Sequence, residues 1–190
     1  LEKSGKVYLV SGAVEKVAEP LKRALQIRQE SLGDDHPATA RVLSLQGDHA
    51  TLLGDLKTAR RLYGKADNII SDFHGSDSHL RFPYRFAFAR TLRRMGELEQ
   101  AESHIQVMLD RLTGDSEETL LKISDLKEEM ALLLLARNKI EDAEKTLKEC
   151  LDTRSKFLSP NSEGVSSAFE TLARIHQADG REVTASALAE

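Results

Sequence analysis

The stretch GDLKTARRLYGKA, residues 54–66, holds a pattern that returns along the whole chain. It opens with a turn residue, Gly54, and small residues follow five and twelve positions later, at Ala59 and Ala66. Turn residues of this kind recur every 42 residues, at Gly12, Gly54, Gly96, Asn138 and Gly180. Gly and Asn adopt the positive φ of a left-handed helix C-cap at the lowest cost. The spacing therefore predicts five helix–turn–helix units with one period.

Other positions keep the same register and form the predicted core. Small residues stand seven positions before the turns, at Gly5, Gly47, Ala89, Ala131 and Ala173, and five positions after them, at Val17, Ala59, Ala101, Ala143 and Ala185. Residues nine and twelve positions after the turns are Leu21, Tyr63, Ile105 and Leu147, then Ala24, Ala66, Met108 and Cys150. Small side chains let two antiparallel helices approach closely, and larger ones fill the space between pairs.

We expect an all-α fold, an α-solenoid of stacked antiparallel helix pairs. The expected helices are 1–11 with 14–32, 38–53 with 56–73, 80–95 with 98–112, 117–137 with 140–157, and 163–178 with 181–190. The units span residues 1–32, 36–74, 79–114, 117–158 and 162–190. The first and last are partial, so we expect a piece of a longer array. Asp35 is the expected N-cap before Pro37, whereas Pro20 falls inside a predicted helix, where it kinks the helix or delays its start.

A small residue in the first helix, a Gly turn, and Ala residues early and late in the second helix together resemble the tetratricopeptide repeat. The usual unit has about 34 residues, so a longer period implies helices longer by about one turn. The linker RALQIRQESLGDDHPATARVLSLQG, residues 23–47, is similar to the kinesin-light-chain type of this repeat. The resemblance implies a right-handed superhelix whose concave groove, lined by the first helix of each pair, binds a partner protein.

The composition excludes several classes of partner. The 190 residues carry 27 Lys and Arg against 31 Asp and Glu, a net charge of −4, which argues against nucleic acid or an anionic membrane. Aromatic residues are 5% and Trp is absent, which leaves little material for a base-stacking platform. The longest apolar run, MALLLLA at 130–136, is far shorter than a membrane span of about 20 residues. With one Cys and no signal-peptide pattern, we expect an intracellular, cytoplasmic chain.

The sequence contains no P-loop, dinucleotide fingerprint, zinc-protease motif or nucleophile elbow. His74 and His79 flank a loop with two Asp residues, but no further ligand stands at a coordinating spacing, which favours a polar loop over a metal site. Cys150 occupies a small-residue packing position, which favours a buried, inert thiol. We therefore expect a protein that is not an enzyme and that needs neither cofactor nor metal.

The resemblance also assigns groove-facing positions, counted back from each turn residue. The resulting peptide-binding candidates are Arg41, Ser44, Asp48, Phe86, Arg90, Arg93, Glu128, Leu132, Leu135 and Arg174. The segment RFPYRFAFARTLRR, residues 81–94, stands out because it carries four of the nine aromatic residues and five Arg. Its Phe88 and Leu92 are assigned to the core. Two arginines beside Phe86, opposite two leucines, suit a peptide with an acidic residue next to a bulky apolar one.

Several alternatives stay open. Phe86 packs between units while the arginines pair with Glu128 or Asp125, or an acidic strip of Asp125, Glu128, Glu129 and Glu170 receives a basic peptide. The MALLLLA segment either lies inside the array or meets another chain. The leading function is a non-catalytic scaffold that binds a partner peptide or helix for cargo or adaptor recognition. The alternatives are a sensor or regulatory region of a larger multidomain protein, and self-association through the terminal repeats and MALLLLA.

Overall fold

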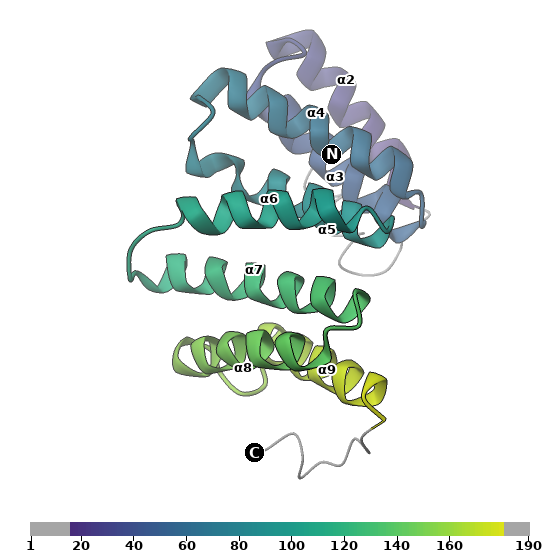
Figure 1. Cartoon of the computed structure of the whole chain (residues 1–190). Coiled ribbons are helices and arrows are strands. Elements are labelled where there is room, and N and C mark those ends of the chain that lie inside the picture. The colour runs from purple at the N-terminus through teal and green to yellow at the C-terminus, as the bar shows by residue number, and fades with distance from the viewer. Residues whose placement is uncertain (1–15, 181–190) are drawn as a thin grey trace. The chain divides into compact units, whose positions relative to one another are not determined.

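The computed structural model describes residues 16–180, and every regular element in that range is helical (Figure 1). The α-helices are α2 (Ala18–Leu32), α3 (Pro37–Leu52), α4 (Leu56–His74), α5 (Phe82–Arg94), α6 (Leu98–Arg111), α7 (Glu117–Ala136), α8 (Ile140–Phe157) and α9 (Glu163–Ala178). A 3-10 turn, η2 (His79–Arg81), precedes α5. The predicted all-α fold of helix pairs is confirmed. The predicted helices 1–11 and 181–190, and the turn at Gly12, lie outside the described residues.

The predicted turn residues all adopt the left-handed backbone conformation. Gly54, Gly96, Asn138 and Gly180 have φ of 77°, 81°, 58° and 72°. Asn138 is the one non-Gly residue in the range 16–180 with a positive φ. Gly54, Gly96 and Asn138 each separate the two helices of a pair, and Gly180 follows α9. The 42-residue spacing of these four residues in the sequence is thus the spacing of left-handed C-caps.

Helix starts follow local capping. The side chains of Asp55, Ser116 and Ser162 accept hydrogen bonds from the first-turn N–H groups of α4, α7 and α9. The expected cap at Asp35 is wrong: His36 is the N-cap of α3, and its Nδ1 accepts from the backbone N–H of Ala38 at 3.1 Å. Pro20 lies in the first turn of α2, where backbone N–H groups have no helical acceptor, so the helix starts late instead of kinking.

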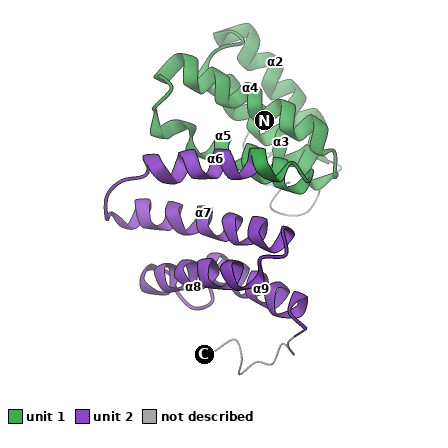
Figure 2. Cartoon of the chain, in the orientation of Figure 1, with its two compact units in different colours: residues 1–100 green, residues 101–190 purple. Residues whose placement is uncertain are grey.

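The chain divides into two compact units, residues 1–100 and 101–190 (Figure 2). In unit 1, α3 and α4 pack through a cluster of Ala40, Leu43, Leu62, Ala66, Ile69 and Ile70. In unit 2, the cores of α7, α8 and α9 meet in a cluster of Ala131, Ile140, Ala143, Leu147, Cys150, Ala168, Leu172 and Ile175. The division into five repeat units stays a prediction.

The predicted packing positions are buried wherever the structure describes them, with one exception. Ala59, Ala89, Ala101, Ala131 and Ala143 are fully buried, whereas Ala173 is half-buried. The MALLLLA segment lies in α7, where its central residues are buried. Among residues 16–180, none of the helices combines the length and hydrophobicity that crossing a bilayer needs.

Candidate peptide-binding site

Three helices of unit 1 meet around the hydroxyl group of Tyr63. This hydroxyl, on α4, donates to Asp48 Oδ1 of α3 at 2.7 Å and lies 3.3 Å from the hydroxyl of Thr51. Burial of the ring raises the pKa of Tyr63, the negative charge of Asp48 raises it further, and the positive charge of Arg90 on α5 acts in the opposite direction. Two predicted groove residues, Asp48 and Arg90, therefore flank one buried phenol.

Gly47 makes room for that phenol. A Cβ atom on Gly47 would lie 2.7 Å from Tyr63 Cε1, closer than carbon atoms approach without a shift. The missing side chain lets the Tyr63 ring lie directly on the backbone of α3. The hydroxyl thereby reaches Asp48, one residue further along α3, and its position is fixed by packing as well as by hydrogen bonds.

On α5, an aromatic and cationic ladder runs along one helix face. The rings of Phe82 and Phe86 stack with centroids 5.6 Å apart, and the guanidinium carbon of Arg90 lies 5.7 Å from the Phe86 centroid. These residues are four apart, so they stand above one another on the helix. Phe82 and Phe86 are half-buried and Arg90 is exposed. The ladder presents a ring edge and a cation held in place by that ring.

The other candidates of unit 1 lie on the same two helices. On α3, Arg41 is exposed and lies about two turns before Asp48, and Ser44 is half-buried and lies about one turn before it. On α5, Arg93 is half-buried and follows Arg90 by three residues. Phe88 and Leu92, assigned to the core, differ: Leu92 is fully buried, and Phe88 is half-buried against Ala50, Ala59 and Tyr63.

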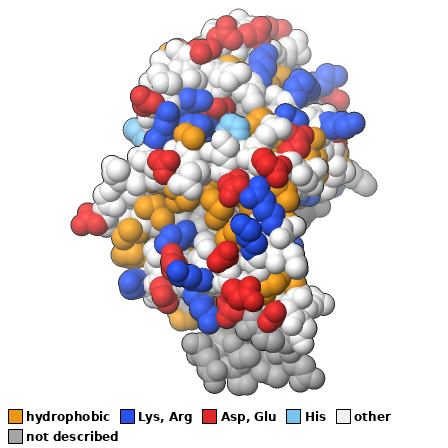
Figure 3. Space-filling model, in the orientation of Figure 1, with side chains coloured by type: hydrophobic (Ala, Val, Ile, Leu, Met, Phe, Trp, Pro, Cys, Tyr) orange, Lys and Arg blue, Asp and Glu red, His pale blue; other side chains and the backbone are white. Residues whose placement is uncertain are grey.

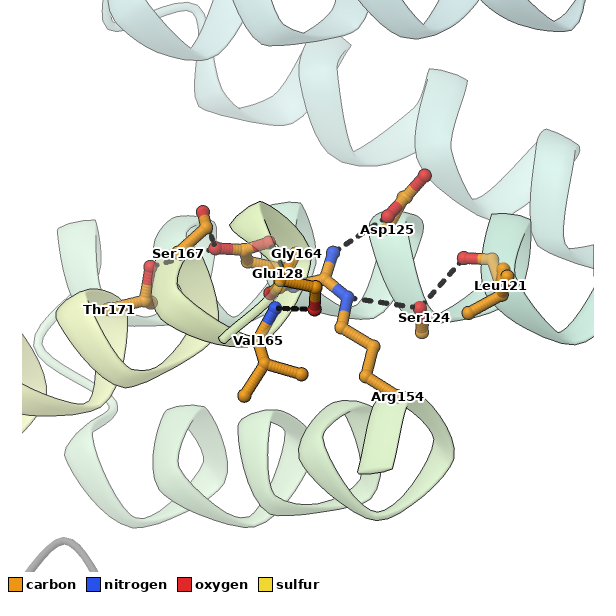
Figure 4. Close-up of polar contacts among 10 residues, drawn as sticks. Leu121, Ser124, Asp125, Glu128, Arg154, Gly164, Val165, Ser167 and Thr171 are labelled. Atoms are coloured by element: carbon orange, nitrogen blue, oxygen red, sulfur yellow. Dashed lines mark hydrogen bonds and ion pairs between the residues drawn. The ribbon is translucent and has the colours of Figure 1, made fainter. Parts of the chain in front are cut away.

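In unit 2, Glu128 belongs to a buried polar network that joins three helices (Figure 4). Arg154 of α8 donates from Nη1 to Glu128 Oε2 and to the carbonyl of Gly164, both at 2.7 Å. Its Nη2 donates to Asp125 Oδ1 at 2.7 Å. The second Glu128 oxygen accepts from Ser167 at 2.7 Å and from Thr171 at 3.1 Å. Glu128 is only 8% exposed, so it holds α7, α8 and α9 together, and we leave it out of the binding surface.

The remaining candidates of unit 2 differ in exposure. Leu132 is buried, and Leu135 packs against the cluster of α7, α8 and α9, so little of either leucine is open to a ligand. Arg174 on α9 is exposed. The alternative of an open acidic strip is wrong, because Glu128 and Glu129 are buried and Asp125 is paired with Arg154. Figure 3 shows acidic and basic side chains interspersed over the face drawn, with hydrophobic side chains between them.

Comparison with known proteins agrees with this architecture. Residues 19–68 match the sequence profile of the tetratricopeptide repeat. The chain carries a tetratricopeptide repeat. Crystal structures of a putative kinesin light chain from Podosopora anserina with nearly identical TPR-like repeats, unsubstituted and as a single-residue variant, have TM-scores of 0.70 and 0.71. Each is 19% identical, and each comparison covers 99% of this chain and 89% of that chain.

A further similar structure is BtubC (BKLC) from P. vanneervenii, with a TM-score of 0.72, 16% identity, and coverage of 93% of this chain and 70% of that chain. At these identities the likeness shows the fold: the tetratricopeptide solenoid of kinesin-light-chain type that the sequence pattern predicted. None of the curated proteins compared with the chain matches it.

Sequence reasoning on the tetratricopeptide repeat missed Arg154. It is 3% exposed, and it follows the buried Leu147 and Cys150 on the same face of α8. The sequence did contain a signal. Arg154 stands seven residues after Leu147 and four residues after Cys150, and this spacing places it on the buried stripe of the helix. Such an Arg needs carboxylate partners, and Asp125 and Glu128 on the preceding helix supply them.

Cys150 fits the interpretation of an inert thiol. The side chain is fully buried, and burial raises its pKa to about 12. The protonated thiol is a poor nucleophile. Within residues 16–180, no three His, Cys, Asp or Glu side chains are grouped so that they could hold a metal ion.

Proposed function

We propose that this tetratricopeptide-repeat chain is a non-catalytic scaffold that binds a peptide segment or helix of a partner protein in the groove lined by the first helices of its pairs. The repeat fold supports a protein-interaction role. The observation that carries the position of the site is the Phe82–Phe86–Arg90 ladder on α5, beside the Asp48–Tyr63 contact. Arg41, Ser44 and Arg93, on α3 and α5 of the same unit, complete the proposed site.

The ligand that fits this surface has an acidic residue next to a bulky apolar one. A guanidinium pairs with a carboxylate through two parallel hydrogen bonds, and Arg90 is already held by the ring of Phe86. Because the cation and the ring are positioned before the ligand arrives, most of the ordering cost falls on the ligand. Recognition of this kind suits a cytoplasmic cargo or adaptor protein, the role for which we propose this chain.

The test is a peptide array and pull-down with the Arg90→Glu/Arg93→Glu variant. We expect this variant to bind peptides that have an acidic residue next to an apolar one at least about tenfold more weakly. Reversing a charge pair at an interface has an effect of this size. The control is Lys145→Glu/Lys156→Glu, which changes the net charge equally at two exposed positions of α8. Equal binding by the wild type and the Arg90→Glu/Arg93→Glu variant would remove the site from α5.

Self-association is a second candidate function, favoured by one observation. Leu52 and Leu53, next to the turn between α3 and α4, are 55% and 62% exposed. Contiguous exposed apolar patches mark protein–protein interaction sites, and these two leucines would form part of such a patch. Sedimentation over a concentration series tests this function: we expect a reversible dimer that Leu52→Ser/Leu53→Ser makes monomeric. A wild-type monomer at every concentration argues against it.

A further inference from the structure

A second surface of unit 1 lies on the side of α4 that faces away from its buried stripe. A hollow of about 470 Å³ opens there, lined by Lys57, Arg60, Arg61 and Lys65 of α4 and by Phe88 of α5. Lys57, Arg61 and Lys65 are exposed, and Phe88 is half-buried at the apolar side of the hollow. The hollow is open and shallow, so a ligand would lie along it and would not be enclosed.

The positive charge of the hollow is only partly compensated. Arg60 pairs with Glu97 at 2.6 Å. Lys57 and Arg61 help to lower the pKa of Asp55, but the hydrogen bonds of Asp55 with Thr58 lower it more. The Asp55 side chain accepts from the backbone N–H of Thr58 at 3.1 Å as the helix cap. In the part of the chain that the structure describes, Lys57, Arg61 and Lys65 form no ion pair, which leaves cations available to an anionic ligand.

One of these cations, Lys57, stands in the first turn of α4, where helix stability favours acids. The N-terminal end of a helix carries partial positive charge, which disfavours cations in the first turn. The first turns of α2, α6 and α8 carry Glu19, Glu99 and Glu141. The first turns of α3, α4 and α5 have no acid, and that of α4 carries Lys57. Lys57 therefore adds no stability to α4 through the helix dipole.

Gly64 shapes the apolar part of the hollow. A Gly in the middle of a helix weakens it, and the positions 42 and 84 residues later hold Gln106 and Lys148. A Cβ atom on Gly64 would lie 3.3 Å from Phe88 Cε2. Gly64 thus allows the Phe88 ring to lie close to α4 and keeps the space above it open.

We propose that this hollow binds a short acidic peptide segment of a partner protein, with carboxylates on Lys57, Arg61 and Lys65 and one apolar side chain against Phe88. Lys57 and Lys65 are eight residues apart on α4, about 12 Å, which matches about four residues of extended peptide. The net charge of −4 over the whole chain disfavours long polyanions and anionic membranes, so a local acidic segment is the better occupant.

This surface is separate from the proposed groove. Phe88 and Arg90 are two residues apart on α5, and two residues turn an α-helix by about 200°, so their side chains point to different sides. Binding at one surface can therefore be removed without touching the other.

The experiment uses fluorescence anisotropy with the labelled peptide EEFEEE and its neutral counterpart QQFQQQ. We expect the full chain to bind EEFEEE at least about tenfold more tightly, and the difference to shrink in high salt. Arg61→Glu/Lys65→Glu should weaken EEFEEE binding by about tenfold or more, and the neutral variant Arg61→Gln/Lys65→Gln by less. Phe88→Leu, which keeps an apolar side chain, should weaken it by about threefold.

Two control variants assign the effect to this hollow. Lys145→Glu/Lys156→Glu changes the net charge equally on α8 and should leave EEFEEE binding within about twofold. Because EEFEEE also fits the proposed groove, the hollow variants are compared in the Arg90→Glu/Arg93→Glu background, where the binding that remains reports the hollow. Circular dichroism confirms that each variant is helical. The proposal is overturned if EEFEEE does not bind in that background, or if Lys145→Glu/Lys156→Glu weakens its binding as much as Arg61→Glu/Lys65→Glu does. It is also overturned if the chain binds heparin or anionic vesicles but not the peptide.

Discussion

Tyr63 holds a place that Leu147 holds 84 residues further along, and each of these residues packs with a small residue on the preceding helix. The small residue is Gly47 for the tyrosine and Ala131 for the leucine. The extra volume of the phenol is accommodated by the missing methyl group. A larger side chain at position 63 is thus matched by a smaller one at position 47, sixteen residues earlier. The summed volume of the two side chains stays nearly constant.

This exchange makes Gly47→Ala destabilising even though Ala favours helices. The clash with Tyr63 costs about 1–3 kcal/mol, and the helix preference returns about 0.5–1 kcal/mol. We expect urea unfolding to show a loss of about 1–2 kcal/mol. The double variant Gly47→Ala/Tyr63→Leu recreates the pairing of Ala131 with Leu147 and should recover part of the loss. Strictly additive effects in this double-mutant cycle would contradict the account.

At the scale of residues, the repeat register predicted burial well and polar partners poorly. Ala59, Ala101 and Ala143 are buried because close helix approach leaves no room for larger side chains. Glu128 was predicted to face a ligand, but it pairs with Arg154, which stands 26 residues later on another helix. Register counts positions along one helix, and it carries no information on which charged side chains lie opposite each other.

At the scale of elements, helix ends could be predicted because they depend on local sequence. The α4 and α8 starts at Leu56 and Ile140 agree with the expected residues 56 and 140. The start of α5 differs, since η2 occupies residues 79–81 and α5 begins only at Phe82. The bidentate contact of Arg81 with Asp67 of α4, at 2.9 and 2.7 Å, fixes this linker and depends on the tertiary fold.

The network around Arg154 ties α7, α8 and α9, so its loss should affect all three. Glu128→Ala leaves the buried guanidinium without its most buried acid and two hydroxyl groups without an acceptor, which we expect to cost about 3–5 kcal/mol. Glu128→Gln keeps an acceptor and should cost less. The apolar pair Glu128→Leu/Arg154→Met should recover most of the stability, because both charges are removed together. Urea unfolding followed by circular dichroism measures all three; a loss below about 1 kcal/mol for Glu128→Ala contradicts the assigned role.

At the scale of the whole molecule, each unit buries an acid with a raised pKa: Tyr63 in unit 1 and Cys150 in unit 2. In the unfolded chain these groups lose their protons near pH 10 and pH 9, the ordinary values. In the folded chain they stay protonated to higher pH. Their contribution to the free energy of unfolding is therefore fully present below pH 9, and it is lost as the pH rises above 9. For Cys150, with a folded pKa of about 12, the loss reaches about 1.4 kcal/mol at pH 10.

We therefore expect the urea midpoint to be steady from pH 7 to 8.5 and to fall by pH 10. A thiol-specific reagent should react with Cys150 at pH 8 only in urea that unfolds the chain, because burial and the scarcity of thiolate both slow the reaction. Cys150→Ala should lower stability at pH 8 and flatten its pH dependence. Rapid labelling of the native chain at pH 8, or a midpoint unchanged at pH 10, would contradict the assignment.

The candidate site also shows where sequence reasoning ends. Its ten residues come from both compact units, and the structure shows two associations among them, Asp48 and Arg90 near Tyr63, and Arg90 over the ring of Phe86. The sequence predicted the faces of α3 and α5, because periodicity fixes them. It did not predict the hollow beside Phe88, because a hollow depends on Gly64 and on side chains from two helices at once.

The close packing of Tyr63 on Gly47 also restricts which substitutions this protein can accept during evolution. If the glycine gains a methyl group first, the ring is displaced, and if the ring is trimmed first, a void opens and Asp48 and Thr51 lose the hydroxyl between them. Either single substitution gives a less stable protein, and only the two substitutions together give a stable one. Gly47 and Tyr63 should therefore be inherited or replaced together, although they stand on different helices.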